Sequence, residues 1–329
     1  MAVYFSDAWT YHGLQALVIE NEELRITVLP ELGGKIWSIV AKRHDREMLW
    51  HHPRMVPRKA PFGATYDNWF CGGWDDIFPN DFPVEIDGEL WPDHGEVWSL
   101  PARWWVETCS DHEVAVGFEH QGIVLPTRFR KIVRLRAGES SLHLEYQILN
   151  VGRDPLDVHW KSHPALPLGD GARLHLPIQT VIDESGFGEV FRDPTFAWPL
   201  ATRADGSPLD LRILPAPASG DVQFWYGTEL TSGWAAVSYP AADVGFGLTF
   251  DQTVQNSVWV FTTAGGWRTL NVVILEPCTG FHADLRVAKA AGSVLSLGPG
   301  QTRAATISAH VLSGREAVAR FERSNGVDR

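Results

Sequence analysis

The sequence is poor in cysteine, in basic residues and in long apolar runs, and each shortage excludes a class of protein. The three cysteines are odd in number and form no C-x-x-C pair, which fits a reducing compartment without a disulfide framework. Lys and Arg total 28 against 40 Asp and Glu, so the net charge of −12 argues against a nucleic-acid partner and against an anionic membrane as partner. No apolar run is long enough for a transmembrane helix, and the first residues do not resemble a secretory signal. We therefore expect a cytoplasmic protein.

Tryptophan is the residue present in excess, with 15 Trp against 6 Tyr. The chain of 329 residues is 44% hydrophobic and 21% charged, which is typical of a globular protein with a full core. Most of the indoles are expected to pack in that core. A few can instead line a carbohydrate site, because a pyranose C–H face stacks on indole while the indole N–H satisfies a hydroxyl. Composition alone leaves both interpretations open.

Alternation of apolar and polar residues dominates the chain and predicts β-strands. Gly, Pro, Asn and Asp clusters separate the segments, and no repeat of fixed period points to a propeller or a solenoid. A helix is expected only over 314–323, and long ordered loops are expected over 51–99 and 160–210. We therefore predict an all-β fold, a large sandwich forming a single domain over residues 1–329. The predicted strands are 24–29, 35–40, 129–136, 141–149, 233–239, 245–250, 257–261, 270–275 and 303–312.

Two loop motifs carry polar residues in arrangements suited to a binding site. Residues 71–80 read CGGWDDIFPN, in which paired glycines permit tight backbone geometry and two acids, an amide and two aromatics follow. This motif is either a turn that enters a strand or a loop that lines a site. Residues 91–96 read WPDHGE, in which His94 lies in a loop and is more available than a histidine on an apolar face.

The motif HWKSHP at residues 159–164 brings a lysine and two histidines together. Alternation along a strand directs His159, Lys161 and His163 to one face. A helix with the His-x3-His spacing would suit zinc, but Pro155 and Pro164 argue against a helix and no third ligand stands out. We therefore expect no metal site here.

The motif VVILEP at residues 272–277 ends an apolar run with Glu276. A carboxylate in this position is costly unless it is paired or serves a task. Near a histidine, a buried glutamate fits a general base with a shifted pKa, whereas at a strand end it can simply reach water. The chain has no G-x-S-x-G motif, so a serine hydrolase has no support.

Taken in order, these motifs resemble the galactose mutarotase-like superfamily and, within it, the aldose 1-epimerases. The stretch 26–39 is similar to that family's opening strand pair, with its proline and paired glycines. Residues 71–80 resemble the loop that precedes the sugar site. Residues 92–98, PDHGEVW, resemble the family's His-Gly motif, and 162–166, SHPAL, lie where its second histidine is expected.

The second half of the chain continues the same resemblance. Residues 206–212, GSPLDLR, are similar to the Gly-Thr-Pro-x-Asp-x-Arg stretch of the mutarotases. LEPCT at 275–279 and LGPGQ at 297–301 resemble the strand of the catalytic glutamate and the turn that closes the domain. The similarity therefore extends over nearly the whole chain.

This resemblance implies a large antiparallel β-supersandwich and an enzyme that interconverts sugar anomers by opening and reclosing the pyranose ring. It implies Glu276 as the base that takes the O1 proton, His163 as the acid that protonates the ring oxygen, and His94 as the group that holds or polarises the ring-oxygen side. It also implies a small-molecule sugar as partner and no cofactor. The residues expected to bind the sugar are Asp210, at the family's sugar-binding acid, and Trp74, Asn80 and Trp91.

Other functions stay open at the level of sequence. The same fold can serve a lyase or an isomerase of modified sugars, a non-catalytic carbohydrate-binding protein, or a purely structural sandwich. A phosphorylated substrate would need an Arg or Lys cluster, for which Arg54, Arg58 and Lys59 are candidates on a loop that is otherwise simply solvated. No pattern in the sequence points to a particular oligomeric state.

Overall fold

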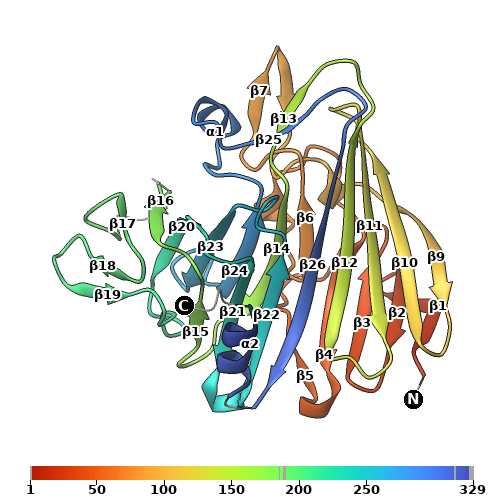
Figure 1. Cartoon of the computed structure of the whole chain (residues 1–329), viewed down its shortest axis with the longest axis horizontal. Helices are drawn as coiled ribbons and strands as arrows, with labels where there is room; N and C mark the ends of the chain where they lie inside the picture. Colours follow the sequence, from red (N-terminus) through yellow and green to blue (C-terminus); the bar gives the residue numbers. More distant parts are fainter. Residues whose placement is uncertain (1, 185, 188–189, 315, 326–329) are drawn as a thin grey trace.

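The computed structural model describes residues 2–184, 186–187, 190–314 and 316–325, and its strands build two large sheets (Figure 1). Neighbouring strands pair antiparallel throughout both sheets. The first sheet has 12 strands, in the order β1 (Tyr4–Tyr11), β2 (Leu14–Glu20), β3 (Leu24–Leu29), β4 (Lys35–Ala41), β6 (Trp74–Ile77), β14 (Lys161–Pro167), β24 (Asn271–Cys278), β23 (Ser257–Ala264), β20 (Val222–Thr228), β16 (Thr180–Asp183) and β17 (Thr195–Ala197), with β5 (Arg46–Glu47) paired to β4. The second sheet has eight, in the order β15 (Arg173–His175), β21 (Trp234–Tyr239), β22 (Val244–Phe250), β26 (Thr302–Ser313), β12 (Ser141–Asn150), β11 (Thr127–Arg136), β10 (Glu113–Gln121) and β9 (Arg103–Cys109).

Shorter elements complete the described chain. Three strand pairs lie outside the large sheets: β13 (Leu156–Val158) with β25 (Leu295–Leu297), β18 (Leu200–Thr202) with β19 (Pro208–Asp210), and β7 (Val84–Ile86) with β8 (Glu89–Trp91). Short 3-10 turns are η1 (Lys42–His44), η2 (Tyr66–Asn68), η3 (Val97–Ser99) and η4 (Pro240–Ala242), and the α-helices of the described residues are α1 (Leu285–Ala290) and α2 (Ala317–Asn325). Within this part of the chain, neither helix combines the length and the apolar character that crossing a membrane requires.

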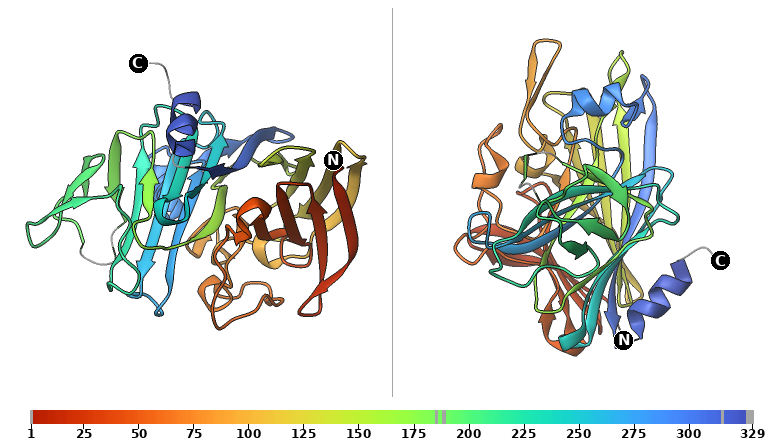
Figure 2. Two further views of the ribbon diagram at one scale, coloured as in Figure 1. Left: turned by 90° about the horizontal axis from the view of Figure 1, so that it is seen from below. Right: turned by 90° about the vertical axis from the view of Figure 1, so that its left-hand side faces the viewer.

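The two sheets pack face to face around one continuous apolar core. Val133 of β11 and Leu144 of β12 belong to the same buried cluster as Ile26 and Val28 of β3. In Figure 1, β9 to β11 pass in front of β1 to β3, and the right-hand view of Figure 2 separates these two layers. Strands from the first and middle thirds of the chain therefore share one core.

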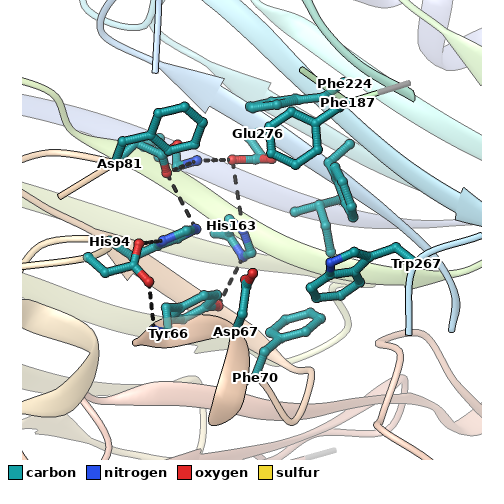
Figure 3. A pocket seen from close by; sticks show the side chains of 15 residues that line it. Tyr66, Asp67, Phe70, Asp81, His94, His163, Phe187, Phe224, Trp267 and Glu276 are labelled. Carbon is teal, nitrogen blue, oxygen red and sulfur yellow. Dashed lines mark hydrogen bonds and ion pairs between the residues drawn. The ribbon is translucent and has the colours of Figure 1, made fainter. Parts of the chain in front are cut away.

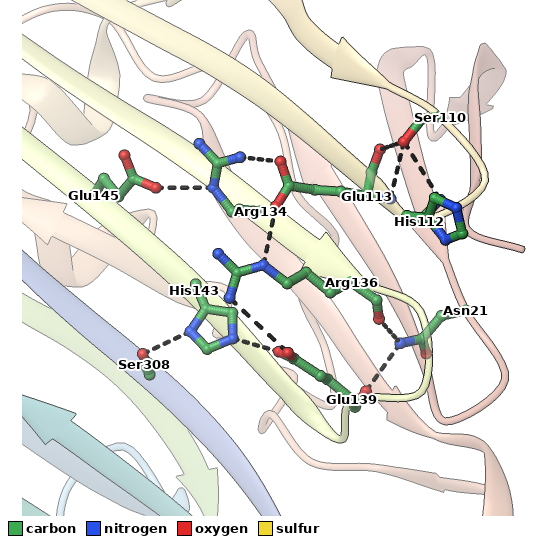
Figure 4. A network of polar contacts seen from close by, with 10 residues as sticks. All are labelled: Asn21, Ser110, His112, Glu113, Arg134, Arg136, Glu139, His143, Glu145 and Ser308. Carbon is green, nitrogen blue, oxygen red and sulfur yellow. Dashed lines mark hydrogen bonds and ion pairs between the residues drawn. The ribbon is translucent and has the colours of Figure 1, made fainter.

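The outer face of the second sheet is polar at β11 and β12, and this explains the alternation that predicts these two strands. Arg134 on β11 forms ion pairs with Glu113 of β10 and Glu145 of β12, and His143 contacts Glu139 (Figure 4). The residues between these charged positions face inward and are buried. A strand with one solvated and one buried face produces this period of two.

The structure confirms the all-β class and the antiparallel sandwich, and each predicted strand is present within a residue or a few of its expected bounds. The helix expected over 314–323 is present as α2, while residue 315 lies outside the described residues. The expectation of a single helix was wrong, because α1 is a second one. The prediction of long loops over 51–99 and 160–210 was wrong, because these stretches contain the strands β6 to β8 and β14 to β19. Several of these strands are three or four residues long, and β6 and β14 are buried along nearly their whole length, so they lack alternation.

Candidate active site

A pocket opens over the middle of the first sheet, where β14 lies between β6 and β24. Lys161 and His163 are alternate residues of β14 and therefore point to the same face, and Glu276 projects beside them from β24. The loops between β5 and β9 cover one side of the pocket, and the turn after β23 covers another. Its lining residues are Tyr66, Asp67, Phe70, Asp81, Phe82, Asp93, His94, Lys161, His163, Phe187, Phe224, Phe261, Trp267, Ile274 and Glu276 (Figure 3).

Three buried charged side chains, Lys161, Asp81 and Glu276, form the polar side of the pocket. Lys161 Nζ lies 2.6 Å from Asp81 Oδ1 and 2.5 Å from Glu276 Oε2, and the three side chains are each 2% exposed. Burial of two carboxylates is costly, and the ammonium between them offsets their repulsion. The triad therefore fixes Glu276 at the pocket surface with one oxygen against Lys161.

Two histidines face the triad. His163 Nε2 lies 3.9 Å from Glu276 Oε2, and its Nδ1 lies 3.3 Å from the Tyr66 hydroxyl. His94 Nδ1 lies 2.8 Å from Asp93 Oδ1, its Nε2 lies 3.5 Å from Asp81 Oδ1, and its ring stacks on Tyr66. The carboxylate and the two imidazoles thus surround a common space (Figure 3).

A tight turn holds His94 close to the sheet. His94 and Gly95 both have left-handed backbone, with φ of 57° and 67°. A Cβ on Gly95 would lie 2.1 Å from the carbonyl oxygen of Phe78, so glycine is required for this close approach. The His94 amide donates to the carbonyl of Asp81, which brings the imidazole next to the Asp81 carboxylate.

Glu276, His163 and His94 have different surroundings, which shift their pKa values in different directions. Burial raises the pKa of Glu276 to about 6, although the Lys161 ammonium opposes this shift. Burial and the positive charge of Lys161 hold the pKa of His163 well below its usual value. Burial also disfavours the charged form of His94, but Asp81 and Asp93 outweigh it and raise the pKa of that imidazole. Near neutral pH the site therefore contains an ionised Glu276, a neutral His163 and a His94 whose protonated form is favoured.

An apolar wall faces the charged side. Phe224 of β20, Phe261 of β23 and Phe187 pack edge to face against one another. Trp267, in the turn after β23, packs edge to face with Phe261, and the Arg268 guanidinium lies 4.8 Å from the centre of the indole ring. An aromatic surface opposite polar groups suits a ligand with both C–H faces and hydroxyls.

Of the residues predicted from the sequence, the structure brings His94, His163 and Glu276 together. Asp210 is elsewhere: it lies on β19 in the hairpin with β18, and it holds Arg212 through contacts of 2.9 and 2.7 Å. The residue that matches the family's sugar-binding acid is therefore a surface carboxylate, and it is hydrogen-bonded to Arg212, two residues further along the chain.

The other three predicted sugar contacts also lie outside the pocket lining, and each is used inside the fold. Trp74 is fully buried between the sheets, and its indole N–H donates to Ser162 Oγ. Asn80 is fully buried and donates its amide to the carbonyls of Phe82 and Pro92. Trp91 belongs to the main apolar core. These side chains support the loops around the pocket without lining it.

Several lining residues were missed by the sequence analysis. Asp81 directly follows the CGGWDDIFPN motif, but nothing local shows that its partner is Lys161. Alternation did direct Lys161 to the face of His163, whereas His159 precedes the strand and bonds to the carbonyl of Ser293. Tyr66 and Trp267 lie in turns without a motif, so no sequence signal marks them.

The basic residues considered for a phosphate lie away from the pocket lining. Lys59 pairs with Glu31, and Arg58 stacks on Trp69 at 4.4 Å. Arg54 donates to the backbone carbonyl of Arg268. Within the described ranges, no group of three or more His, Cys, Asp and Glu side chains is arranged to hold a metal ion.

Solved structures resemble this chain over nearly its whole length, although no family model matches it. A candidate aldose 1-epimerase from Klebsiella pneumoniae matches with a TM-score of 0.79 at 17% identity, covering 98% of this chain and 86% of that chain. A galactose mutarotase-like protein from Clostridium acetobutylicum matches with a TM-score of 0.68 at 10% identity, covering 95% and 99%. A candidate aldose 1-epimerase from Escherichia coli K12 matches with a TM-score of 0.64 at 16% identity, covering 92% and 100%. The chain therefore has the galactose mutarotase-like fold, which confirms at the level of fold the resemblance carried by its motifs.

Proposed function

We propose that this protein is an aldose 1-epimerase, which interconverts the anomers of a free sugar by opening and reclosing its ring. The observation that carries the proposal is that Glu276, His163 and His94, from three separate parts of the chain, face one pocket. Solvated residues at strand ends have no reason to converge in this way, whereas acid–base catalysis at a ring carbon needs it.

The proposed reaction moves two protons. Glu276 takes the proton of the O1 hydroxyl, O1 forms a double bond to C1, and the bond from C1 to the ring oxygen breaks as a histidine gives that oxygen a proton. Rotation about the C1–C2 bond and the reverse transfers then yield the other anomer. A carboxyl group with a pKa of about 6 is suited to accept and return a proton near neutral pH. This chemistry requires no cofactor.

The choice between the two histidines follows from their contacts. Family resemblance assigns the acid to His163. His94, however, has a carboxylate at each ring nitrogen, and Asp81 and Asp93 raise its pKa, so it is the better proton donor. We therefore assign the role of general acid to His94. His163 takes the role of a hydrogen-bond acceptor. The aromatic wall of Phe224, Phe261 and Trp267 would pack against the C–H face of the sugar.

The test is anomer exchange in a panel of free aldoses, followed by NMR with the spontaneous rate subtracted. The wild type is expected to accelerate exchange of at least one sugar, and Glu276→Gln should lower that turnover by about 10²–10⁴. Glu145→Gln is the matched control, because this residue lies on the outer face of the other sheet in an ion pair with Arg134 (Figure 4). It should keep wild-type turnover.

Two results would overturn the proposal. If the wild type accelerates no aldose in the panel, the epimerase assignment is lost. If NMR instead reports a new unsaturated product or a rearranged carbon skeleton, the protein is a lyase or an isomerase of modified sugars that uses the same groups. Binding of a sugar without any turnover would make it a carbohydrate-binding protein.

A further inference from the structure

A chain of buried polar contacts leads from the interior to His163. Lys35 Nζ donates to Asp75 Oδ2 at 2.6 Å and to the carbonyl of Gly72 at 2.8 Å. The Tyr66 hydroxyl donates to the same Asp75 oxygen at 2.7 Å, and its own oxygen lies 3.3 Å from His163 Nδ1. Lys35, Asp75, Tyr66 and His163 are all at most 5% exposed, so water has little access to these contacts.

The chemistry of the side chains in this series of contacts determines which group donates each hydrogen bond. An ionised carboxylate only accepts, and the Tyr66 hydroxyl has a single hydrogen, which Asp75 receives. Toward His163, the Tyr66 oxygen can therefore only accept, so the hydrogen of that contact must be on His163 Nδ1. A neutral imidazole with its hydrogen on Nδ1 has its lone pair on Nε2.

The Nε2 atom is the one that faces the pocket, 3.9 Å from Glu276 Oε2. The titratable and charged groups around the ring come from every neighbouring element: Lys161 on its own strand, Asp75 on β6, Glu276 on β24, Tyr66 in η2, His94 in the turn after β8, and Lys35 on β4 behind Asp75. Burial and the charge of Lys161 lower the pKa of His163, which agrees with a neutral ring.

We propose that Tyr66, held by Asp75 and Lys35, is a positioning residue that fixes His163 as the neutral Nδ1–H tautomer. His163 then presents an Nε2 lone pair to the ligand and accepts a hydrogen bond from a sugar hydroxyl. It has no proton at Nε2 to give to a ring oxygen. The tautomer follows from the contacts alone, whereas its consequence, that His94 supplies the proton, rests on the proposed epimerase function.

His94 has the opposite surroundings. Each of its ring nitrogens faces a carboxylate oxygen, Asp93 Oδ1 at 2.8 Å and Asp81 Oδ1 at 3.5 Å, which favours a hydrogen on both. The longer contact leaves Nε2–H able to turn to a ligand, because Asp81 keeps its 2.6 Å ion pair with Lys161. The two histidines of the site thus divide into an acceptor and a donor.

The tautomer is measured directly by long-range ¹H–¹⁵N NMR of protein labelled with ¹⁵N-histidine. The His163 signals are identified by their loss in His163→Gln. At pH 7, His163 is expected to show one protonated Nδ1 and one unprotonated Nε2. A signal with the hydrogen on Nε2, or an imidazolium, would overturn the proposal, since Tyr66 would then donate to the ring or leave it free. This experiment needs neither a substrate nor a substitution at Tyr66.

The role of Tyr66 is tested by Tyr66→Phe, which keeps the ring that stacks on His94 and removes only the hydroxyl. The His163 signals should shift toward the Nε2–H tautomer. Tyr239→Phe is the matched control, because Tyr239 is also buried but lies on β21 in the other sheet, and it should leave the His163 signals unchanged. An unchanged tautomer in Tyr66→Phe would remove Tyr66 from this role.

The kinetic consequence is tested separately with a sugar that the wild type turns over. His94→Gln should lose about 10²–10⁴ in kcat, as expected for a lost general acid, while His163→Gln should lose much less. Tyr66→Phe should raise KM roughly 5- to 30-fold with little change in kcat, because His163 then no longer accepts the hydrogen bond of the sugar hydroxyl. A larger loss in His163→Gln than in His94→Gln would return the acid to His163. If no sugar is turned over, the epimerase function fails while the NMR result still decides the tautomer.

Discussion

Lys161 Nζ lies 2.5 Å from Glu276 Oε2 and forms the centre of a buried triad with Asp81. The ammonium acts on both carboxylates in the same direction. It holds the pKa of Asp81 below its usual value despite burial, and it limits the rise in the pKa of Glu276, which burial takes to about 6. The lysine therefore keeps the proposed base ionised at neutral pH.

Replacing this lysine is expected to weaken both folding and turnover. Lys161→Met leaves two buried carboxylates without their cation, which should cost about 3–5 kcal/mol of unfolding free energy. The pKa of Glu276 should rise further, so turnover at pH 7 should fall and partly recover at higher pH. Urea unfolding and a pH–rate profile measure the two effects.

The control for this variant is Lys289→Met. Lys289 is 62% exposed and pairs with Asp157 at the surface, so its loss should cost no more than about 1 kcal/mol. An acidic limb of the pH–rate profile that does not move in Lys161→Met would mean that Lys161 does not set the protonation of the base.

A neutral sugar is expected to be a better substrate than its phosphorylated form. The pocket lining has four acids, Asp67, Asp81, Asp93 and Glu276, against one lysine, Lys161. It excludes the basic residues Arg54, Arg58 and Lys59. A phosphate dianion would be repelled by these acids, so kcat/KM for a hexose should exceed that for its 6-phosphate by at least about tenfold. Parallel assays of glucose and galactose with their 6-phosphates measure the ratio, and a preference for the phosphates would contradict this prediction.

Alternation in the sequence revealed strands such as β11, in which one face meets solvent and the other is buried. Strand β11 could be predicted because Arg134 faces outward while Val133 and Leu135 are buried. Strand β6 could not, because its acids are buried: Asp75 pairs with Lys35, and Asp76 pairs with a lysine of the opposite sheet. A buried ion pair removes the alternation on which strand prediction depends.

The candidate site divides in a similar way. His94, His163 and Glu276 could be selected because short motifs surround them. The partners that give these groups their protonation states, Asp81 and Tyr66, are remote in sequence from Lys161 and His163, and only the fold brings them into contact. Asp210 was selected on a short match and proved to be bonded to its neighbour Arg212.

A buried histidine should make the stability of the protein depend on pH. His120 on β10 is 5% exposed, and burial together with the charge of Lys131 lowers its pKa to about 4. In the unfolded chain the ring titrates near 6.5. The neutral ring therefore stabilises the fold fully above pH 6.5, and this contribution is lost as the pH falls from 6.5 to 4, by about 3 kcal/mol in total.

His120→Gln tests this contribution through urea unfolding at a series of pH values. The wild type should lose about 3 kcal/mol more than the variant between pH 6.5 and 4. His112→Gln is the control, because His112 is exposed at the turn before β10 and should follow the wild type. Parallel curves for the wild type and His120→Gln would show that this ring is not held neutral by the fold.

Trp267 should contribute to sugar binding more than to turnover. Arg268 lies over one face of its indole and Phe261 packs edge to face with it, while the indole also lines the pocket. A stacked sugar face is held equally in the ground state and the transition state, and an interaction of this kind affects KM more than kcat. Trp267→Ala should raise KM about tenfold, which corresponds to about 1.4 kcal/mol, and leave kcat within about twofold.

Trp9→Ala, which removes a 61% exposed indole from the edge strand β1, should change neither constant. A fall in kcat at unchanged KM in Trp267→Ala would mean that the indole acts on the transition state alone, and the sugar face would then have to rest on Phe224 and Phe261.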